Sequence, residues 1–147
     1  MEEAKTRGRG RPRCEETEGR ILCTTMQLLD ELGYGGVTIE AIAKRAGVSK
    51  ATMYRRWPNR ASVILSAFLC RVLKQSEVDV SQDPESCLRQ QMDQVVKVLC
   101  NSGGTVLSAL LAEAQACPHF AAEFRDHFVE IFREKAYDHV HRGIQTG

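Results

Sequence analysis

The sequence predicts an all-α protein in which a small three-helix head precedes a longer helical body. Three observations support this fold class. Apolar residues recur at spacings of three, four and seven through most of the chain, which is the period of helices that bury one face. Glycine, proline and capping residues separate these stretches where helices would start and stop. No segment shows the strict alternation of a half-buried strand.

The first helix is expected from about Glu15 up to a cluster of glycines. Its apolar stripe consists of Ile21, Leu22, Met26, Leu28, Leu29 and Leu32. The glycines that end it are Gly33, Gly35 and Gly36, and Tyr34 between them is expected to pack into the core. Residues 1–14 contain alternating Gly and Arg without an apolar period, which predicts a flexible basic arm.

Two short helices follow, joined by a tight turn. Thr38 is a good N-cap for the first of them, whose apolar face consists of Ile39, Ile42, Ala43 and Ala46. Gly47 suits the left-handed position after a helix, and Ser49 caps the next helix. That helix is expected from Lys50 to about Arg56, because Pro58 disfavours helical geometry at Trp57.

Four longer helices are predicted for the remainder. Asn59 caps the first, whose stripe is Leu65, Phe68, Leu69 and Val72, and residues 76–83 are expected to form a loop. Asp83 and Pro84 form a cap and first-turn pair for the next helix, which Gly103 and Gly104 are expected to end. The last two helices are expected over 105–116 and 118–143. We therefore divide the chain into the arm, a head over 15–75 and a body over 76–147, which is expected to be incomplete.

Charge is distributed unevenly between the two halves. Residues 1–60 contain 12 Lys and Arg against 8 Asp and Glu, whereas residues 61–147 contain 8 against 11. The N-terminal half is thus the part suited to a polyanion. No run approaches the roughly 18 apolar residues of a membrane span, and no apolar stretch follows the charged N-terminus as in a signal peptide. We expect a cytoplasmic protein with no membrane partner.

Catalytic and metal-binding motifs are not evident. The six cysteines have no ligand-type spacing, so two interpretations stay open: small packed thiols, or redox-sensitive thiols near the head at Cys14 and Cys23. His139 and His141 are two residues apart and do not share a helix face. We find no nucleophile elbow, phosphate loop or zinc-protease motif. We expect that the chain is not an enzyme and that it needs no metal or cofactor.

The segment 38–57 has the pattern of a helix-turn-helix that reads DNA. A helix in the major groove needs a second helix to brace it, with small residues where the two approach and a tight turn between them. The exposed start of the reading helix would present Ser49, Lys50, Ala51 and Thr52 to bases and phosphates. Tyr54, Arg55 and Arg60 are expected to bind backbone phosphates, which fix register without reading sequence.

The run from Thr38 to Arg60 resembles the signature of TetR-type repressors, a T-x-x-x-I-A-x-x-A-G-V-S-x-x-T-x-Y core followed by an aromatic residue. The resemblance implies a homodimer on a pseudo-palindromic operator, and a helical body that binds a small effector and moves the heads. By position, the DNA contacts that it implies are Thr38, Ser49, Lys50, Ala51, Thr52, Tyr54 and Arg60, with Arg55 at a variable position. Members of that family continue for two further long helices, whereas this sequence stops at Gly147.

Three alternatives accompany this prediction. The basic arm, with Arg11 and Arg13, would enter a minor groove or remain solvated. Three aromatic residues of the body would line an effector pocket or simply fill the core; they are Phe124, Phe128 and Phe132. The chain as a whole would act as a ligand-responsive repressor in the bacterial cytoplasm, associated with the nucleoid, or as a truncated regulator that serves as a protein-interaction module.

Overall fold

The computed structural model describes residues 11–75 and 83–146, and every regular element in those ranges is a helix. In chain order these are α1 (Arg11–Gly36), α2 (Ile39–Ala46), α3 (Lys50–Tyr54), α4 (Arg60–Gln75), α5 (Pro84–Cys100), α6 (Ser102–Ala116), α7 (Pro118–Phe124), the π-helix η1 (Arg125–Val129) and α8 (Glu130–Thr146). The predicted all-α fold is confirmed.

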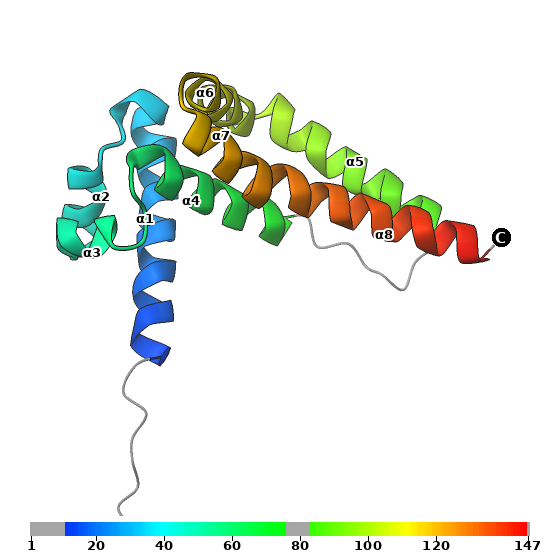
Figure 1. Ribbon diagram of the computed structural model, residues 1–147, viewed down its shortest axis with the longest axis horizontal. Helices are drawn as coiled ribbons and strands as arrows, with labels where there is room; N and C mark the ends of the chain where they lie inside the picture. Colours follow the sequence, from blue (N-terminus) through cyan, green and yellow to red (C-terminus); the bar gives the residue numbers. More distant parts are fainter. Residues whose placement is uncertain (1–10, 76–82, 147) are drawn as a thin grey trace, which may run out of the picture.

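The head consists of α1, α2 and α3, with α4 running from it into the body. In Figure 1, α2 and α3 lie on one side of the long α1, while α4 crosses α1 and continues toward the other helices. Helix α4 packs against α1 in the head and against α6 and α7 in the body. Helix α1 also contacts α6, so α1 and α4 together join the two parts of the molecule.

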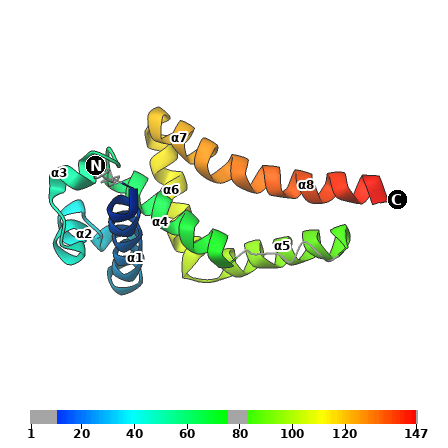
Figure 2. The same cartoon turned by 90° about the horizontal axis from the view of Figure 1, so that it is seen from below.

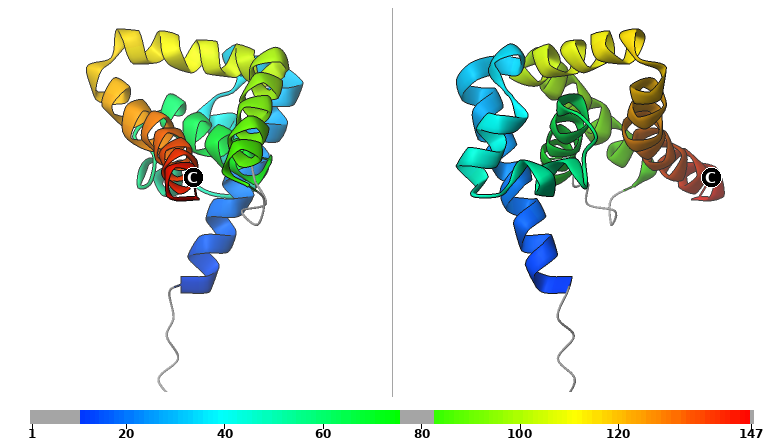
Figure 3. Two further views of the ribbon diagram at one scale, coloured as in Figure 1. Left: turned by 90° about the vertical axis from the view of Figure 1, so that its right-hand side faces the viewer. Right: turned by 60° about the vertical axis from the view of Figure 1, so that its left-hand side comes forward.

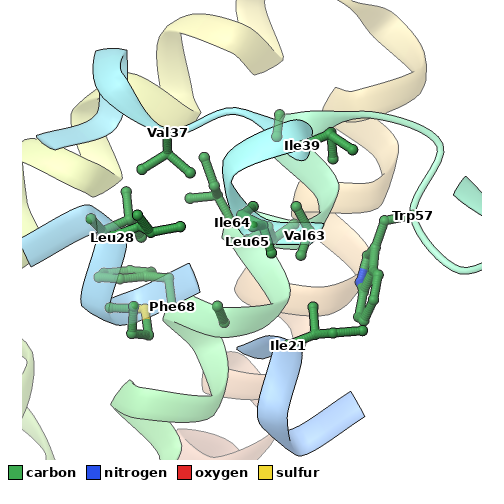
Figure 4. Close-up of a cluster of buried hydrophobic side chains, with 14 of the residues drawn as sticks. Ile21, Leu28, Val37, Ile39, Trp57, Val63, Ile64, Leu65 and Phe68 are labelled. Carbon is green, nitrogen blue, oxygen red and sulfur yellow. The ribbon is translucent and has the colours of Figure 1, made fainter. Parts of the chain in front are cut away.

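One continuous apolar core fills the head and extends along α4 (Figure 4). Ile21 and Leu28 of α1 meet Ile64, Leu65 and Phe68 of α4 there, and none of the five exposes more than 2% of its surface. Burying a large apolar side chain of this kind contributes about 1.5–3 kcal/mol. Helix α4, which continues into the body, thus also forms part of the core of the head.

The body is built around α6, which spans from α5 to α7 across the end of the head (Figure 3). Helices α5 and α8 extend away from the head and run antiparallel, with their far ends in contact (Figure 2). A Cβ placed on Gly143 of α8 would lie 3.5 Å from Cβ of Pro84 at the start of α5. A stripe of phenylalanine rings packs η1, which precedes α8, against α4.

Several boundaries differ from the sequence prediction. Helix α1 starts at Arg11, four residues before Glu15, so the last part of the predicted arm is helical. Helix α3 ends at Tyr54, and the stretch from Pro118 to Thr146 passes through Gly143 without a break. Leu32, assigned to the buried stripe of the first helix, is 53% exposed, because the chain leaves helical geometry at Gly33, where φ is 67°.

The break between α5 and α6 lies at Asn101, two residues before the predicted glycine pair. Gly103 and Gly104 instead form the first turn of α6, which lies close against the end of α5 and against α4. A Cβ on Gly103 would lie 2.9 Å from the carbonyl oxygen of Val98 and 3.4 Å from Cε2 of Phe68. Glycine is thus required here by close approach of backbone, and not by a turn conformation.

Replacement Gly103→Ala is expected to destabilise the protein by about 1–3 kcal/mol, since a methyl group added to a filled space forces backbone to shift. The midpoint of urea unfolding measures this loss. Gly19→Ala in α1 is the matched control, because no atom lies within 4 Å of its added Cβ. Alanine favours a helix interior by up to about 1 kcal/mol over glycine. Equal effects at the two positions would contradict the close packing at Gly103.

Neither the cysteines nor the other potential metal ligands of the described residues form a site. Cys23, Cys100 and Cys117 are free and exposed, Cys70 is free and half-buried, and Cys87 is buried. Among these residues no three His, Cys, Asp or Glu side chains gather in a way that would hold a metal ion. No single described helix is long and apolar enough to cross a membrane, although Pro84–Val98 and Ser102–Ala116 together reach that length and composition across an 81° bend.

Candidate DNA-binding site

Helix α2 is held by its N-cap and by its buried face. The Thr38 hydroxyl oxygen accepts a hydrogen bond from the Ala41 amide at 3.1 Å, as the sequence predicts. All four residues of the predicted apolar face are buried: Ile39, Ile42, Ala43 and Ala46. In this cap the Thr38 hydroxyl oxygen acts only as an acceptor. The hydroxyl proton therefore remains available for a hydrogen bond to an acceptor outside the protein.

The turn between α2 and α3 depends on Gly47. Its φ of 65° lies in the left-handed region, and its amide bonds to the carbonyls of Ala43 and Lys44. The Val48 amide then donates to the Ala43 carbonyl at 3.0 Å, which closes the turn. Helix α3 thereby leaves α2 at a fixed angle.

Replacement Gly47→Ala is expected to cost about 1–2 kcal/mol of stability, because an L-residue with a side chain is strained in the left-handed region. A Cβ at this position would meet no atom within 4 Å, so the cost comes from backbone conformation alone. Thermal unfolding followed by circular dichroism measures it. The position-matched variant Gly47→Asn should lose less, because asparagine tolerates this conformation better; the reverse order would contradict the account.

Helix α3 begins with a pair of interacting hydroxyls. The Ser49 hydroxyl oxygen accepts from the Thr52 amide at 3.1 Å and lies 2.9 Å from the Thr52 hydroxyl oxygen. One hydroxyl proton is used between the two oxygens, so the other remains free to point outward. Ser49 is exposed, and the pair stands at the start of the helix that the sequence assigns to DNA.

The outer surface of α3 is polar and exposed. Lys50, Ala51, Tyr54 and Arg55 all lie on the surface, and the side chain of Tyr54 is turned outward with 51% of it exposed. The Lys50 ammonium pairs with Glu40 of α2 at 3.1 Å. Hydrogen bonds from the backbone amide of Glu40 itself and from Lys50 hold the pKa of the Glu40 carboxyl below its usual range.

The inner surface of α3 anchors it to the core. Met53 is fully buried, and Trp57, just beyond the helix, is 5% exposed. The Trp57 indole donates a hydrogen bond to the Ser66 hydroxyl of α4 at 2.9 Å. Trp57 therefore belongs to the core. Helix α3 is thus attached to α4 by side-chain packing as well as by the short link that joins them.

Arg60 is a predicted DNA contact. In the described part of the protein, its guanidinium group bonds to residues of other structural elements. Its guanidinium lies 4.8 Å from the ring centre of Tyr34 and donates to the carbonyls of Tyr34 and Val37, each at 3.3 Å. It also pairs with Glu113 of α6 at 3.3 Å. The sequence reasoning missed Glu113, since no local pattern links residues 53 positions apart.

The three phenylalanines assigned to a pocket stack on one another. Phe124 and Phe128 have ring centres 5.2 Å apart. The ring centres of Phe128 and Phe132 are 5.1 Å apart, and Phe128 lies 6.0 Å from Phe68 of α4.

A cavity of about 890 Å³ lies between α1, α4, the end of α5 and the start of α6. Phe68 lines this cavity, whereas the other three rings do not. Arg11 and Arg13 lie in the first turn of α1, but the structure does not describe their side chains.

The geometry defines a helix-turn-helix: a capped bracing helix, a glycine turn and a short second helix with an exposed polar surface. Comparison with known proteins gives the family. A model described as bacterial regulatory proteins of the tetR family matches residues 21–67. The HTH-type transcriptional regulator YdeS of Bacillus subtilis is 35% identical over 139 residues, which cover 95% of this chain and 70% of YdeS. The chain belongs to the tetR family of bacterial transcriptional regulators; it is a DNA-binding regulator and not an enzyme.

Other similar proteins agree with this assignment. The HTH-type transcriptional regulator Rv1556 of Mycobacterium tuberculosis is 32% identical over 116 residues, 77% of this chain but 55% of Rv1556. The crystal structure of the TetR family regulator SCO0332 superimposes with a TM-score of 0.81 at 25% identity, covering 90% of this chain and 73% of that one. A TetR-family regulator from Mesorhizobium loti shares the fold, with a TM-score of 0.64 at 17% identity.

Proposed function

We propose that the protein is a ligand-responsive repressor that binds a pseudo-palindromic operator as a homodimer. The observation that carries this proposal is the exposed polar surface of α3, held rigidly by the caps, the Gly47 turn and buried Met53. A rigid, outward-facing helix of this kind suits the major groove. A pair of such heads, one on each protomer, would read two half-sites related by the twofold axis of the dimer.

Within the groove, Lys50 would reach a guanine edge or a phosphate, while Ala51 and Thr52 would contact thymine methyl groups. The free hydroxyl proton of the Ser49–Thr52 pair, the Thr38 hydroxyl, Tyr54 and Arg55 would donate to phosphates. Lys50 would exchange Glu40 for DNA as it binds. Arg60 is not part of this proposed interface, because its guanidinium bonds to Glu113 and lies over the Tyr34 ring.

The effector would enter the cavity between head and body. Its volume, about 890 Å³, falls within the range of small-molecule sites, roughly 300–1,000 Å³. Apolar walls from Phe68, Val72 and Val106 face polar groups such as Lys97 and the Asp30–Arg71 ion pair. A ligand wedged between α1 and α6 would alter their spacing, and thereby shift the population of heads that fit the operator.

Dimerisation would use the outer face of α8. Tyr137, Val140 and Ile144 follow one another at helical spacing, and their exposed fractions are 73%, 47% and 75%. Apolar side chains clustered on an exposed face are typical of protein interfaces. Arg11 and Arg13, in the first turn of α1, would add contacts in a minor groove. The protein would act in the bacterial cytoplasm at the nucleoid.

Selection from a random-sequence duplex pool tests this proposal. Repeated selection with the purified protein should enrich a sequence with two inverted half-sites whose centres lie about one helical turn or a multiple apart. Light scattering of the complex should give an even number of chains per duplex. An enriched single half-site with one chain bound would contradict the homodimer, and no enrichment at all would contradict operator binding.

The second candidate is a protein-interaction module that pairs with a longer regulator through α8. The exposed apolar face of α8 is the observation that favours it. In that case the protein alone would select no sequence, but adding it to a full-length relative would weaken the binding of that relative to its own operator. The selection experiment therefore separates the two functions.

A further inference from the structure

The contacts of Arg60 join three elements that meet where head and body touch. Arg60 is the first residue of α4, Tyr34 belongs to the last turn of α1, Val37 to the link between α1 and α2, and Glu113 to the last turn of α6. The Arg60 guanidinium donates to the carbonyls of Tyr34 and Val37, covers the Tyr34 ring and pairs with Glu113. One side chain thus connects the end of α1, the start of α4 and the end of α6.

A parallel connection starts two residues further along, in the same turn of α4. The buried Ser62 hydroxyl donates to the Glu123 carboxylate of α7 at 2.7 Å, while Asn59 caps the helix through the Ser62 amide at 2.9 Å. The N-terminal turn of α4 therefore bonds to two carboxylates of the body. Because only residues 55–59 separate this turn from α3, a movement of α6 or α7 would act on the DNA-reading helix through it.

The same contacts make Arg60 a poor phosphate ligand. The guanidinium has five N–H donors, and at least three of its hydrogen bonds go to groups inside the protein. Glu113 also offsets its positive charge, so little net attraction remains for a phosphate. Burial, with the charge of Glu113, raises the pKa of the neighbouring Tyr34 to about 12, consistent with an environment poor in water.

We propose that Arg60 is a positioning residue that couples the DNA-binding head to the body, with Tyr34 and Glu113 as its partners, and does not bind DNA itself. The inference rests on DNA binding through α3 as proposed above. Tyr34 also lines the cavity between head and body, so a ligand there would lie one side chain away from this connection. Loss of Arg60 or of Glu113 would let the head change its orientation relative to the body.

Binding of fluorescent, selected operator duplex to Arg60→Gln, Glu113→Gln and the double variant tests this inference. Each single variant should raise the Kd for the duplex by the same factor. We expect a factor of about five, which is the lower end of the typical range for coupling between two sites. The double variant should be no weaker than either single one, and the salt dependence should be unchanged. Arg60→Lys should fail to restore binding, since an ammonium cannot reproduce the guanidinium fork. Arg89→Gln, which breaks the exposed Arg89–Glu85 pair on α5, is the matched control and should bind normally.

A phosphate-binding Arg60 would behave differently. Arg60→Gln would lower the salt slope by about one, Arg60→Lys would restore binding, and Glu113→Gln would leave affinity unchanged or raise it. Any of these results would overturn the inference. If the wild-type protein selects no DNA, the proposed function fails but the coupling remains testable: urea unfolding of the wild type, the two single variants and the double variant should show non-additive losses, whereas additive losses would overturn it.

Discussion

Replacement Phe68→Ala is expected to lower the free energy of unfolding by about 3–5 kcal/mol, as is typical for a large aromatic residue removed from a core. Phe68 is 1% exposed, stacks on Phe128 and faces the close approach at Gly103. It contacts both the head core and the body. Since small domains are stable by only about 5–15 kcal/mol, this loss removes a large part of the total, and the urea midpoint should fall accordingly.

Phe132→Ala is the control for Phe68→Ala. Phe132 stands at the far end of the same row of rings and is half-buried, so its loss should be clearly smaller. If Phe68→Ala costs less than about 1 kcal/mol, α4 does not hold the head and body together through this side chain.

The double charge reversal Lys50→Glu with Arg55→Glu is expected to lower affinity for the selected operator by at least about a hundredfold. Removing one side chain that bonds to a base edge costs about 1–3 kcal/mol of binding free energy, and about 1.4 kcal/mol corresponds to a factor of ten. Both residues are exposed on or beside α3, so stability should change little. Fluorescence anisotropy measures the affinity, and circular dichroism the fold.

The matched control reverses two exposed charges of the body, Arg89→Glu with Arg125→Glu, and changes the net charge by the same amount. It should retain nearly all affinity at physiological salt, where charges beyond about 8 Å are largely screened. Equal losses in the two double variants would indicate that overall charge, and not the surface of α3, governs binding.

The parts of the fold that sequence predicts best are those decided by neighbouring residues. The caps at Thr38, Ser49 and Asp83 bond as expected, because an N-cap needs only an oxygen and the amide three residues on. Gly47 likewise adopts the left-handed conformation that a helix end requires. The scaffold of the DNA-reading surface is thus determined by a run of about twenty residues.

Features that depend on distant residues are not predictable in this way. The sequence predicts the end of α5 at Gly103 and not at Asn101, because it does not reveal that Val98 lies against that glycine. The motif does not reveal the bond between Arg60 and Glu113, because the two residues are 53 positions apart in sequence. The cavity is likewise formed by four helices, and neither helical period nor motif indicates which side chains surround it.

The most direct test of DNA recognition through α3 is the affinity of the purified protein for the selected duplex and for a scrambled duplex, across a salt series. We expect the selected sequence to bind at least about 10³-fold more tightly at physiological salt. Both affinities should fall steeply with salt, as phosphate contacts require. Equal affinity for the two duplexes at every salt concentration would contradict the account.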